Sequence, residues 1–322
     1  MQIFISTFSQ MLVIFLFLAI GFILRKKNIV PDNAPSILSK MELYVFNVAL
    51  TLKNMINYCT VENFKANLDL VFYGFATILF AIAISYPLSR LFVKNSKENS
   101  ERKYLRNIYK YALTFGNYGF MGNFIVLSIF GDEMFFKYSM FTLSINILCT
   151  SWGLGILMPS DAKKSRIKQL VKCFLTPPFI SMIVGILLGF ADIKQYIPPF
   201  LNTVLSNAAD CMGPVAMLLA GMAVGGYNFK GLFTNKKIYL VTLFRLILIP
   251  VTLLLILKLI KVSETILICS LIAYATPLGM NTIVYPAAFG GETKTGSSMA
   301  MISNIFAIIT IPLMYLLFVV VL

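Results

Sequence analysis

The sequence predicts an all-α polytopic membrane protein of ten transmembrane helices, and its composition is the first observation that points there. Of the 322 residues, 58% are hydrophobic and only 12% are charged, whereas a soluble domain is about one quarter charged and under half apolar. The second observation is that the apolar residues fall in long blocks rather than in short strands with polar faces. A water-soluble globule could not bury so much apolar surface, so the lipid bilayer must be the solvent for most of the chain.

Composition also excludes several classes of function. The chain has no His, which removes the usual general base and the commonest metal ligand. The five cysteines are scattered and never form a CxxC spacing, so neither a disulfide framework nor a metal site is indicated. We therefore predict that the protein is not an enzyme and carries no cofactor and no bound metal.

Ten stretches have the roughly 20 apolar residues that a span needs. The first is followed, rather than preceded, by its positive charges at 25–27, which favours a retained span over a cleavable signal peptide. The second is the least regular, because charged and amide residues interrupt it. The ten lie near 3–24, 36–57, 68–93, 108–130, 135–158, 174–192, 201–226, 238–261, 265–290 and 297–322.

Basic residues support this count because they gather on alternate connections. The connections 24–36, 93–108, 158–174 and 226–238 carry most of the Lys and Arg, and the others carry few. By the positive-inside rule the basic set is cytoplasmic, which places both termini on the non-cytoplasmic side of a multi-pass protein of the cell (plasma) membrane. The same distribution explains the net charge of +14 without a nucleic-acid partner, which would need one dense basic face.

Weak internal similarity predicts two repeats of five helices each, 1–160 and 161–322. Val48-Ala49-Leu50 and Met55 match Val215-Ala216-Met217 and Met222 at a constant offset. Phe130-Gly131-Asp132-Glu133 similarly matches Phe289-Gly290-Gly291-Glu292 at the end of the ninth span. Because five is odd, the second repeat would be inverted relative to the first, as in many transporters.

Helix-breaking residues occupy corresponding places in the two halves. The fourth span contains Gly116, Asn117, Gly119 and Gly122, and the ninth contains Thr276-Pro277-Leu278-Gly279 followed by Asn281. Interrupted helices at membrane depth are tolerated only within protein or beside water, and paired interruptions indicate a substrate site. Their free N–H groups and positive dipole ends favour an anionic ligand. Either stretch alone would fit close helix packing or a simple proline kink.

At these residues the sequence resembles the auxin efflux carrier family, which includes plant auxin carriers and bacterial malate or malonate permeases. The densest matches are GNYGFMG at 116–122, TPLGMN at 276–281 and AMLLAGM at 216–222. The resemblance implies two inverted five-helix repeats with broken, crossing helices 4 and 9. It also implies a scaffold of spans 1, 2, 6 and 7, a transport part of spans 3–5 and 8–10, and a homodimer.

The resemblance further implies a substrate site at the crossing. Asn117 matches the family asparagine beside the substrate carboxylate, Pro277 matches the crossing proline, and Asn146 matches a polar position nearby, although an interhelical hydrogen bond explains Asn146 equally well. One position departs from the family, because Phe124 stands where members usually have Pro. The predicted substrate-binding residues are Gly116, Asn117, Tyr118, Gly119, Gly122, Asn146, Pro277, Gly279 and Asn281.

Two ionisable residues lie within apolar spans, where charge is expensive. Asp210 is a candidate for coupling transport to H⁺ or Na⁺, or it is a residue near the interface at the start of a helix. Arg245 could neutralise a substrate carboxylate or pair with Asp210, but we favour a side chain that extends to the cytoplasmic interface.

The first functional hypothesis is a secondary active transporter of a small organic anion, such as a dicarboxylate, working by alternating access at the helix 4/9 crossing. A gradient must supply its energy, because the sequence has no GxxxxGK[ST] nucleotide-binding run. The alternative is a Na⁺- or H⁺-coupled carrier or antiporter of another solute on the same fold. An intramembrane enzyme or a structural membrane protein is a third hypothesis, which the missing His and the paired interruptions disfavour.

Overall fold

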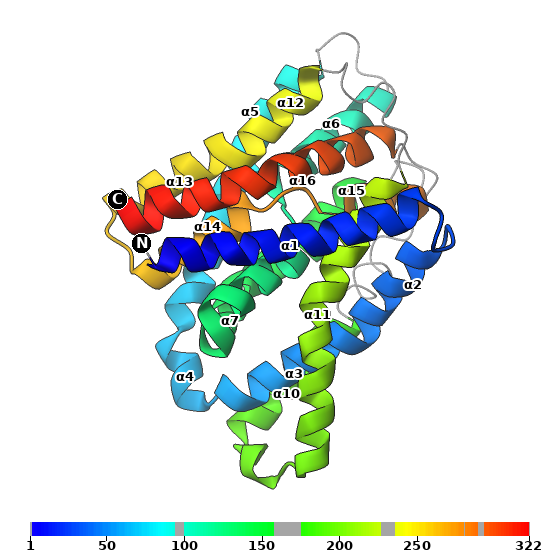
Figure 1. Ribbon diagram of the computed structural model, residues 1–322. Coiled ribbons are helices and arrows are strands. Elements are labelled where there is room, and N and C mark those ends of the chain that lie inside the picture. Colours follow the sequence, from blue (N-terminus) through cyan, green and yellow to red (C-terminus); the bar gives the residue numbers. More distant parts are fainter. Residues whose placement is uncertain are drawn as a thin grey trace. The chain divides into compact units, whose positions relative to one another are not determined.

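The computed structural model describes residues 2–93, 100–157, 175–226, 236–279, 281–288 and 293–321 (Figure 1). Over these residues the only regular secondary structure is helix. Residues 94–99, 158–174, 227–235 and 289–292 lie outside this description. With them lie all or part of three predicted basic connections and the match at 289–292 that ends the ninth predicted span. The helices divide into two compact units, each of which takes segments from both halves of the sequence.

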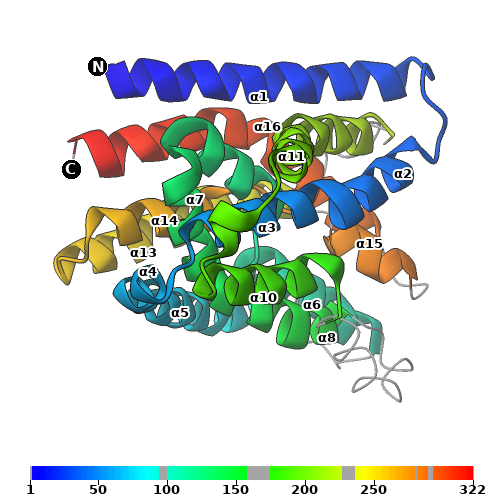
Figure 2. The same ribbon diagram turned by 90° about the horizontal axis from the view of Figure 1, so that it is seen from below.

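Unit 1 consists of residues 1–69, 123–139 and 174–228. Its helices are α1 (Gln2–Lys26), the contiguous run α2 (Ala34–Met41), η1 (Glu42–Phe46) and α3 (Asn47–Tyr58), then α4 (Val61–Ala66), the first part of α7 (Asn123–Leu148), α10 (Pro177–Phe190), η5 (Ile193–Tyr196) and α11 (Pro199–Gly225). α1 packs along α11, and α10 packs along α3 (Figure 2).

Small residues allow the helices of unit 1 to approach closely. A Cβ atom at Gly21 of α1 would overlap the backbone carbonyl of Leu218, and one at Gly221 of α11 would overlap that of Leu18. Helices in a membrane are not held together by the hydrophobic effect. Small residues at their contacts usually allow the close packing that associates them.

Unit 1 also contains a buried carboxyl group. Glu42 begins the π-helical segment η1, which packs against α2, α3, α10 and α11. Its side chain is fully buried, and neither carboxylate oxygen has a hydrogen-bond partner among the described residues.

Unit 2 consists of residues 70–122, 140–173 and 229–322. It contains most of α5 (Leu68–Phe92), α6 (Ser100–Thr114), the π-helix η2 (Tyr118–Gly122), the end of α7, η3 (Cys149–Gly153) and α8 (Leu154–Leu157). Its second half is α12 (Lys236–Leu243), η7 (Phe244–Leu248), α13 (Ile249–Leu259), α14 (Glu264–Ala275), α15 (Asn281–Ala288), α16 (Lys294–Tyr315) and η8 (Leu316–Val321).

Several helices suit a bilayer. Within the described residues, four are long and apolar enough to span it, and a fifth is reached if the bent pair Lys294–Ala307 and Ile309–Val319 counts as one span. Large apolar side chains such as Phe72 of α5 and Leu16 of α1 are exposed. The count of ten spans stays a prediction. The run Ser100–Leu157 counts once although it covers two predicted spans, and α10 and α14 are too short to count.

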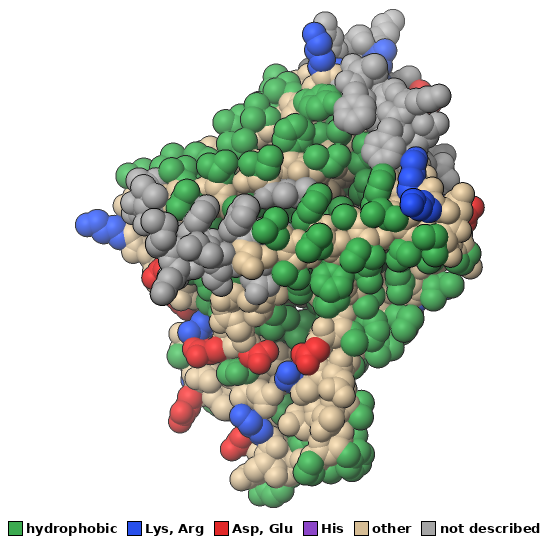
Figure 3. Space-filling view, viewed as in Figure 1, with side chains coloured by type: hydrophobic (Ala, Val, Ile, Leu, Met, Phe, Trp, Pro, Cys, Tyr) green, Lys and Arg blue, Asp and Glu red, His purple; other side chains and the backbone are tan. Residues whose placement is uncertain are grey.

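The face seen in Figure 3 carries few charged side chains. Acidic side chains, with a few lysines, gather over the region of α4 and α7 in unit 1, and hydrophobic side chains cover much of the remaining visible surface (Figure 3). This pattern fits a protein that presents most of its surface to lipid and a limited part to water.

Candidate functional site

The first helix interruption lies between α6 and η2. α6 ends at Thr114, residues 115–117 are not helical, and η2 leads directly into α7. The helix resumes with a bond from the Gly122 amide to the Asn117 carbonyl, 3.0 Å between nitrogen and oxygen. Glycine and asparagine are poor helix formers, so the composition of this stretch accounts for the break without the proline that the family usually carries nearby.

The second interruption lies between α14 and α15, where residues 276–279 are not helical. Pro277 has no N–H and disfavours a helical conformation in the residue before it. Thr276 is accordingly extended, with φ −68° and ψ 148°. The Leu278 amide donates to the Ser303 hydroxyl of α16 at 3.0 Å, so this opened backbone is bonded to a neighbouring helix of the same unit.

The two interruptions contact each other inside unit 2. The Asn117 amide donates to the Pro277 carbonyl at 2.7 Å. A Cβ atom at Gly279 would lie 3.6 Å from the Asn117 Cα and from the Gly116 carbonyl oxygen. Four predicted site residues, Gly116, Asn117, Pro277 and Gly279, therefore lie together, with their backbones in direct contact.

Arg245 of η7 lies at this contact, which corrects the expectation that its side chain reaches the cytoplasmic interface. The side chain is only 1% exposed. Its guanidinium donates to the carbonyls of Thr114, at 3.5 Å, and Ala273, at 3.4 Å. These carbonyls belong to the last turns of α6 and α14, where the helix dipoles are negative. A Cβ atom at Gly116 would overlap Nη2 of Arg245, so the close approach of the guanidinium requires glycine at this position.

Buried and partly buried polar side chains surround the interruptions. The Tyr118 hydroxyl donates to Oδ1 of Asn146 at 2.9 Å, so Asn146 makes the interhelical hydrogen bond that the sequence left as one of two explanations. Nδ2 of Asn281 donates to the Tyr111 hydroxyl at 2.8 Å, and that hydroxyl lies 3.2 Å from the Cys149 sulfur.

Sequence reasoning missed two members of this set, Tyr111 and Cys149. For Cys149 the signal available was helical spacing, because it follows Asn146 by three residues and so lies on the same helix face. No such spacing indicates Tyr111, because the interruption at 115–117 separates it from Tyr118. The remaining predicted residues, Gly119 and Gly122, contribute less to these contacts. A Cβ atom at Gly119 would meet nothing within 4 Å, and Gly122 closes the turn described above.

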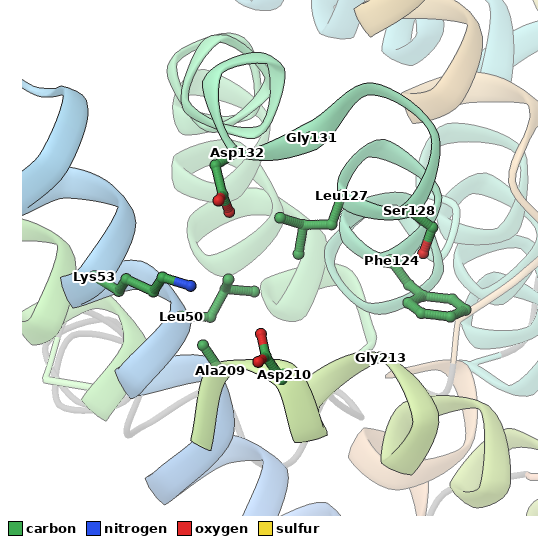
Figure 4. Close-up of a pocket in the computed structure, with 10 residues that line it drawn as sticks. All are labelled: Leu50, Lys53, Phe124, Leu127, Ser128, Gly131, Asp132, Ala209, Asp210 and Gly213. Atoms are coloured by element: carbon green, nitrogen blue, oxygen red, sulfur yellow. The ribbon is translucent and has the colours of Figure 1, made fainter. Parts of the chain in front are cut away.

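Asp210, the predicted coupling residue, belongs to unit 1, whereas these nine residues belong to unit 2. It is an exposed residue of α11 and lines a cavity of about 260 Å³ together with Lys53 of α3 and Asp132 of α7 (Figure 4). We call this the Lys53 cavity. All the residues that line it belong to unit 1.

The Lys53 cavity is shaped by two glycines. Gly131 interrupts α7 with φ 80° and ψ −174°, a conformation that only glycine adopts readily. The following Asp132 is held by a bond from Nδ2 of Asn54 to its carbonyl at 2.8 Å. Gly213 of α11 lies under the ring of Phe124, and a Cβ atom there would overlap the ring. Phe124, the residue that departs from the family pattern, therefore forms part of the cavity wall.

Two acidic residues that follow Gly131 act on a phenol at the end of α3. Burial, and then the charges of Asp132 and Glu133, raise the pKa of the Tyr58 phenol at the end of α3. Glu133 is exposed and receives a bond from Lys137 at 2.7 Å. This hydrogen bond, and then the lysine charge, lower the pKa of the Glu133 carboxyl.

The chain is all-helical, exposes apolar helices and buries the contact between two interrupted helices. These features define a multi-pass membrane protein of the transporter class. The chain belongs to the membrane transport protein family, whose profile matches residues 6–315. This confirms the resemblance to the auxin efflux carriers that the sequence predicted.

Two relatives agree with this assignment. The chain is 24% identical over 317 residues to the uncharacterized transporter MJ1031 of Methanocaldococcus jannaschii, covering 94% of this chain and 96% of the relative. It is 25% identical over 201 residues to the uncharacterized transporter YfdV of Escherichia coli K12, covering 61% of this chain and 62% of the relative. The protein is therefore a membrane transporter.

Proposed function

We propose that this transporter is a secondary active carrier of a small organic anion, with a carboxylate bound where the two interrupted helices of unit 2 meet. The observation that carries the proposal is the direct backbone contact between Asn117 and Pro277 beside the buried Arg245. The substrate carboxylate would bind Asn117, Asn281 and the amides that begin the second halves of the two helices. Helix N-termini bind anions through such amides and their dipoles, and the Arg245 charge favours the same sign of ligand.

The proposal includes the finer architecture that the sequence predicts. Ten spans would form two inverted repeats with crossing helices 4 and 9, the termini would lie outside the cytoplasm, and the protein would be a homodimer in the plasma membrane. Spans 1, 2, 6 and 7 would form the scaffold and the others the transport part. Unit 2 supports this division because it contains both interruptions and the side chains around them.

The test is uptake into proteoliposomes. Purified protein is reconstituted, and uptake of radiolabelled malate and malonate is measured for the wild type, Asn117→Ala and the control Asn202→Ala, which changes an exposed asparagine of α11 in unit 1. We expect Asn117→Ala to reduce uptake at least tenfold, because one charge-assisted hydrogen bond is worth about 1.5–3 kcal/mol, and Asn202→Ala to leave it unchanged. Equal uptake by all three proteins would remove Asn117 from the substrate site.

The alternative, a Na⁺- or H⁺-coupled carrier or antiporter of another solute, keeps the fold and changes the chemistry. Its one supporting feature is Asp210, whose carboxylate lies in unit 1 and not among the residues around the interruptions. Asp210→Asn assayed across a series of pH and Na⁺ concentrations tests it. A coupled carrier would lose its dependence on one of the two ions, and an uncoupled carrier would not.

A further inference from the structure

Three charged side chains from three helices of unit 1 point into one space. Figure 4 shows Lys53 extending between Asp132 above it and Asp210 below it. No direct ion pair joins these groups within the part of the chain that the structure describes. Charged groups that face a common cavity without bonding one another can bind a ligand there.

The backbone keeps these groups apart. Asp132 is fixed by the Gly131 interruption and by the bond from Asn54 to its carbonyl, and Asp210 sits on the continuous helix α11. Ala209 and Gly213, which flank Asp210 on the cavity side, leave the space open because their side chains are small. The cavity is therefore a feature of the fold and does not depend on one side-chain rotamer.

The rest of the lining is largely apolar. Leu50, Phe124 and Leu127 form a hydrophobic wall beside the charges, and Ser128 adds one hydroxyl. At about 260 Å³ the cavity lies just below the usual range of small-molecule sites, about 300–1,000 Å³. It suits a guest of a few carbon atoms that has both an apolar part and charged groups.

The signs of the charges further restrict the class of ligand that the cavity can bind. A simple anion would meet two carboxylates, and a metal cation would meet the lysine ammonium. Within the described residues, no group of three or more Asp, Glu or Cys that could hold a metal ion is found. A zwitterion satisfies all three charges, because its carboxylate can bind the lysine and its ammonium can bind the aspartates.

We propose that the Lys53 cavity binds a small apolar α-amino acid as its zwitterion. Lys53 binds the carboxylate, Asp132 and Asp210 bind the ammonium, and the side chain packs on Leu50, Phe124 and Leu127. This site is separate from the carboxylate site proposed in unit 2, and it gives Asp210 a ligand-binding role in place of ion coupling.

The test uses three probes of similar size and shape with the full-length protein in detergent. Leucine carries both charges, isoamylamine carries only the ammonium, and 4-methylpentanoate carries only the carboxylate. Binding of each is measured by isothermal titration calorimetry. We expect leucine to bind at least about tenfold more tightly than either analogue, because each analogue lacks one charge-assisted contact.

Two variants test which residue binds the carboxylate of the ligand and which binds its ammonium. Lys53→Met should weaken leucine about tenfold without weakening isoamylamine, whereas Asp210→Asn should weaken leucine and isoamylamine without weakening 4-methylpentanoate. Lys65→Met and Asp192→Asn, which change exposed residues of unit 1 outside the cavity, are the matched controls. A variant that merely unfolded would lose all three probes together.

Several results would overturn the proposal. Absence of leucine binding would do so, as would an analogue that binds as tightly as leucine, or NaCl that displaces leucine while KCl does not, which would assign the cavity to a coupling ion. Malate uptake with Asn117→Ala is scored separately. Unchanged uptake by Asn117→Ala together with intact leucine binding would contradict only the carboxylate site. Reduced uptake by Asn117→Ala without leucine binding to the wild type would contradict only the Lys53 cavity proposal.

Discussion

Replacing Arg245 tests whether its guanidinium stabilises the two interrupted helices. The side chain is 1% exposed and lies 3.4–3.5 Å from one carbonyl in the last turn of each helix. At these lengths the hydrogen bonds are weak, so the main contribution is the attraction between a cation and two negative helix ends. A partly buried cation at one helix end contributes up to about 2 kcal/mol. Two ends therefore give up to about 4 kcal/mol.

Arg245→Met removes the charge and keeps an unbranched side chain. We expect its apparent melting temperature in detergent to fall by on the order of 5 °C, because about 2–4 °C per kcal/mol applies to chains of 150–250 residues and a smaller shift to this chain of 322. The control is Arg90→Met, which changes an exposed arginine of α5 and should shift the midpoint little. An unchanged or higher midpoint for Arg245→Met would mean that the cost of burying the guanidinium offsets its attraction to the helix ends.

A double-mutant cycle tests directly whether residue 116 and Arg245 contact each other. A Cβ atom at Gly116 would overlap Nη2 of Arg245 and would lie 2.6 Å from Oγ1 of Thr276. Gly116→Ala should therefore destabilise the wild type by about 1–3 kcal/mol and the Arg245→Met background by less, with a coupling of roughly 0.5–3 kcal/mol. Gly155→Ala, where a Cβ atom meets nothing within 4 Å, should be additive with Arg245→Met. Additivity for both glycines would contradict the contact.

Three further outcomes are expected from unit 1. Gly131→Ala should destabilise the protein by about 1–3 kcal/mol, because its φ of 80° is strained for any other residue; an unchanged melting temperature would show that this kink relaxes freely. Glu42→Met should raise the melting temperature, because it removes a buried carboxyl without a partner among the described residues, and a fall would reveal a bond that the carboxyl makes. Gly213→Ala should be destabilising and should be rescued in part by Phe124→Leu, since its methyl group would overlap the Phe124 ring; chemical denaturation of all three proteins decides, and the absence of rescue would contradict that packing.

The interrupted helices are the part of the site that sequence predicts best. Glycine and proline act on the backbone locally, so the non-helical residues 115–117 and 276–279 follow from Gly116, Asn117, Pro277 and Gly279 almost regardless of context. The family could also be recognised, since the order and spacing of several loose motifs are specific together.

Arg245 shows what sequence alone could not decide. A cation a turn or two from a span end can reach the interface or turn inward, and the choice depends on which carbonyls the tertiary fold brings within its reach. Here the last turns of α6 and α14 provide them. Since these helices are far apart in the chain, no local pattern reveals that arrangement.

The Lys53 cavity was missed for a related reason. Lys53, Asp132 and Asp210 lie far apart in the sequence, and only the packing of α3, α7 and α11 brings them together. Phe124 was noticed as a departure from the family pattern, but its role depends on Gly213, whose lack of a side chain makes room for the ring. Such complementary pairs are visible only once the helices are placed.

The bond from the Asn117 amide to the Pro277 carbonyl has a consequence for genetics. Because it joins the main chains of two distant segments, a substitution that displaces one segment also displaces the other. Second-site suppressors of substitutions at 276–279 should therefore cluster at 115–117. Suppressors of substitutions at 115–117 should likewise cluster at 276–279.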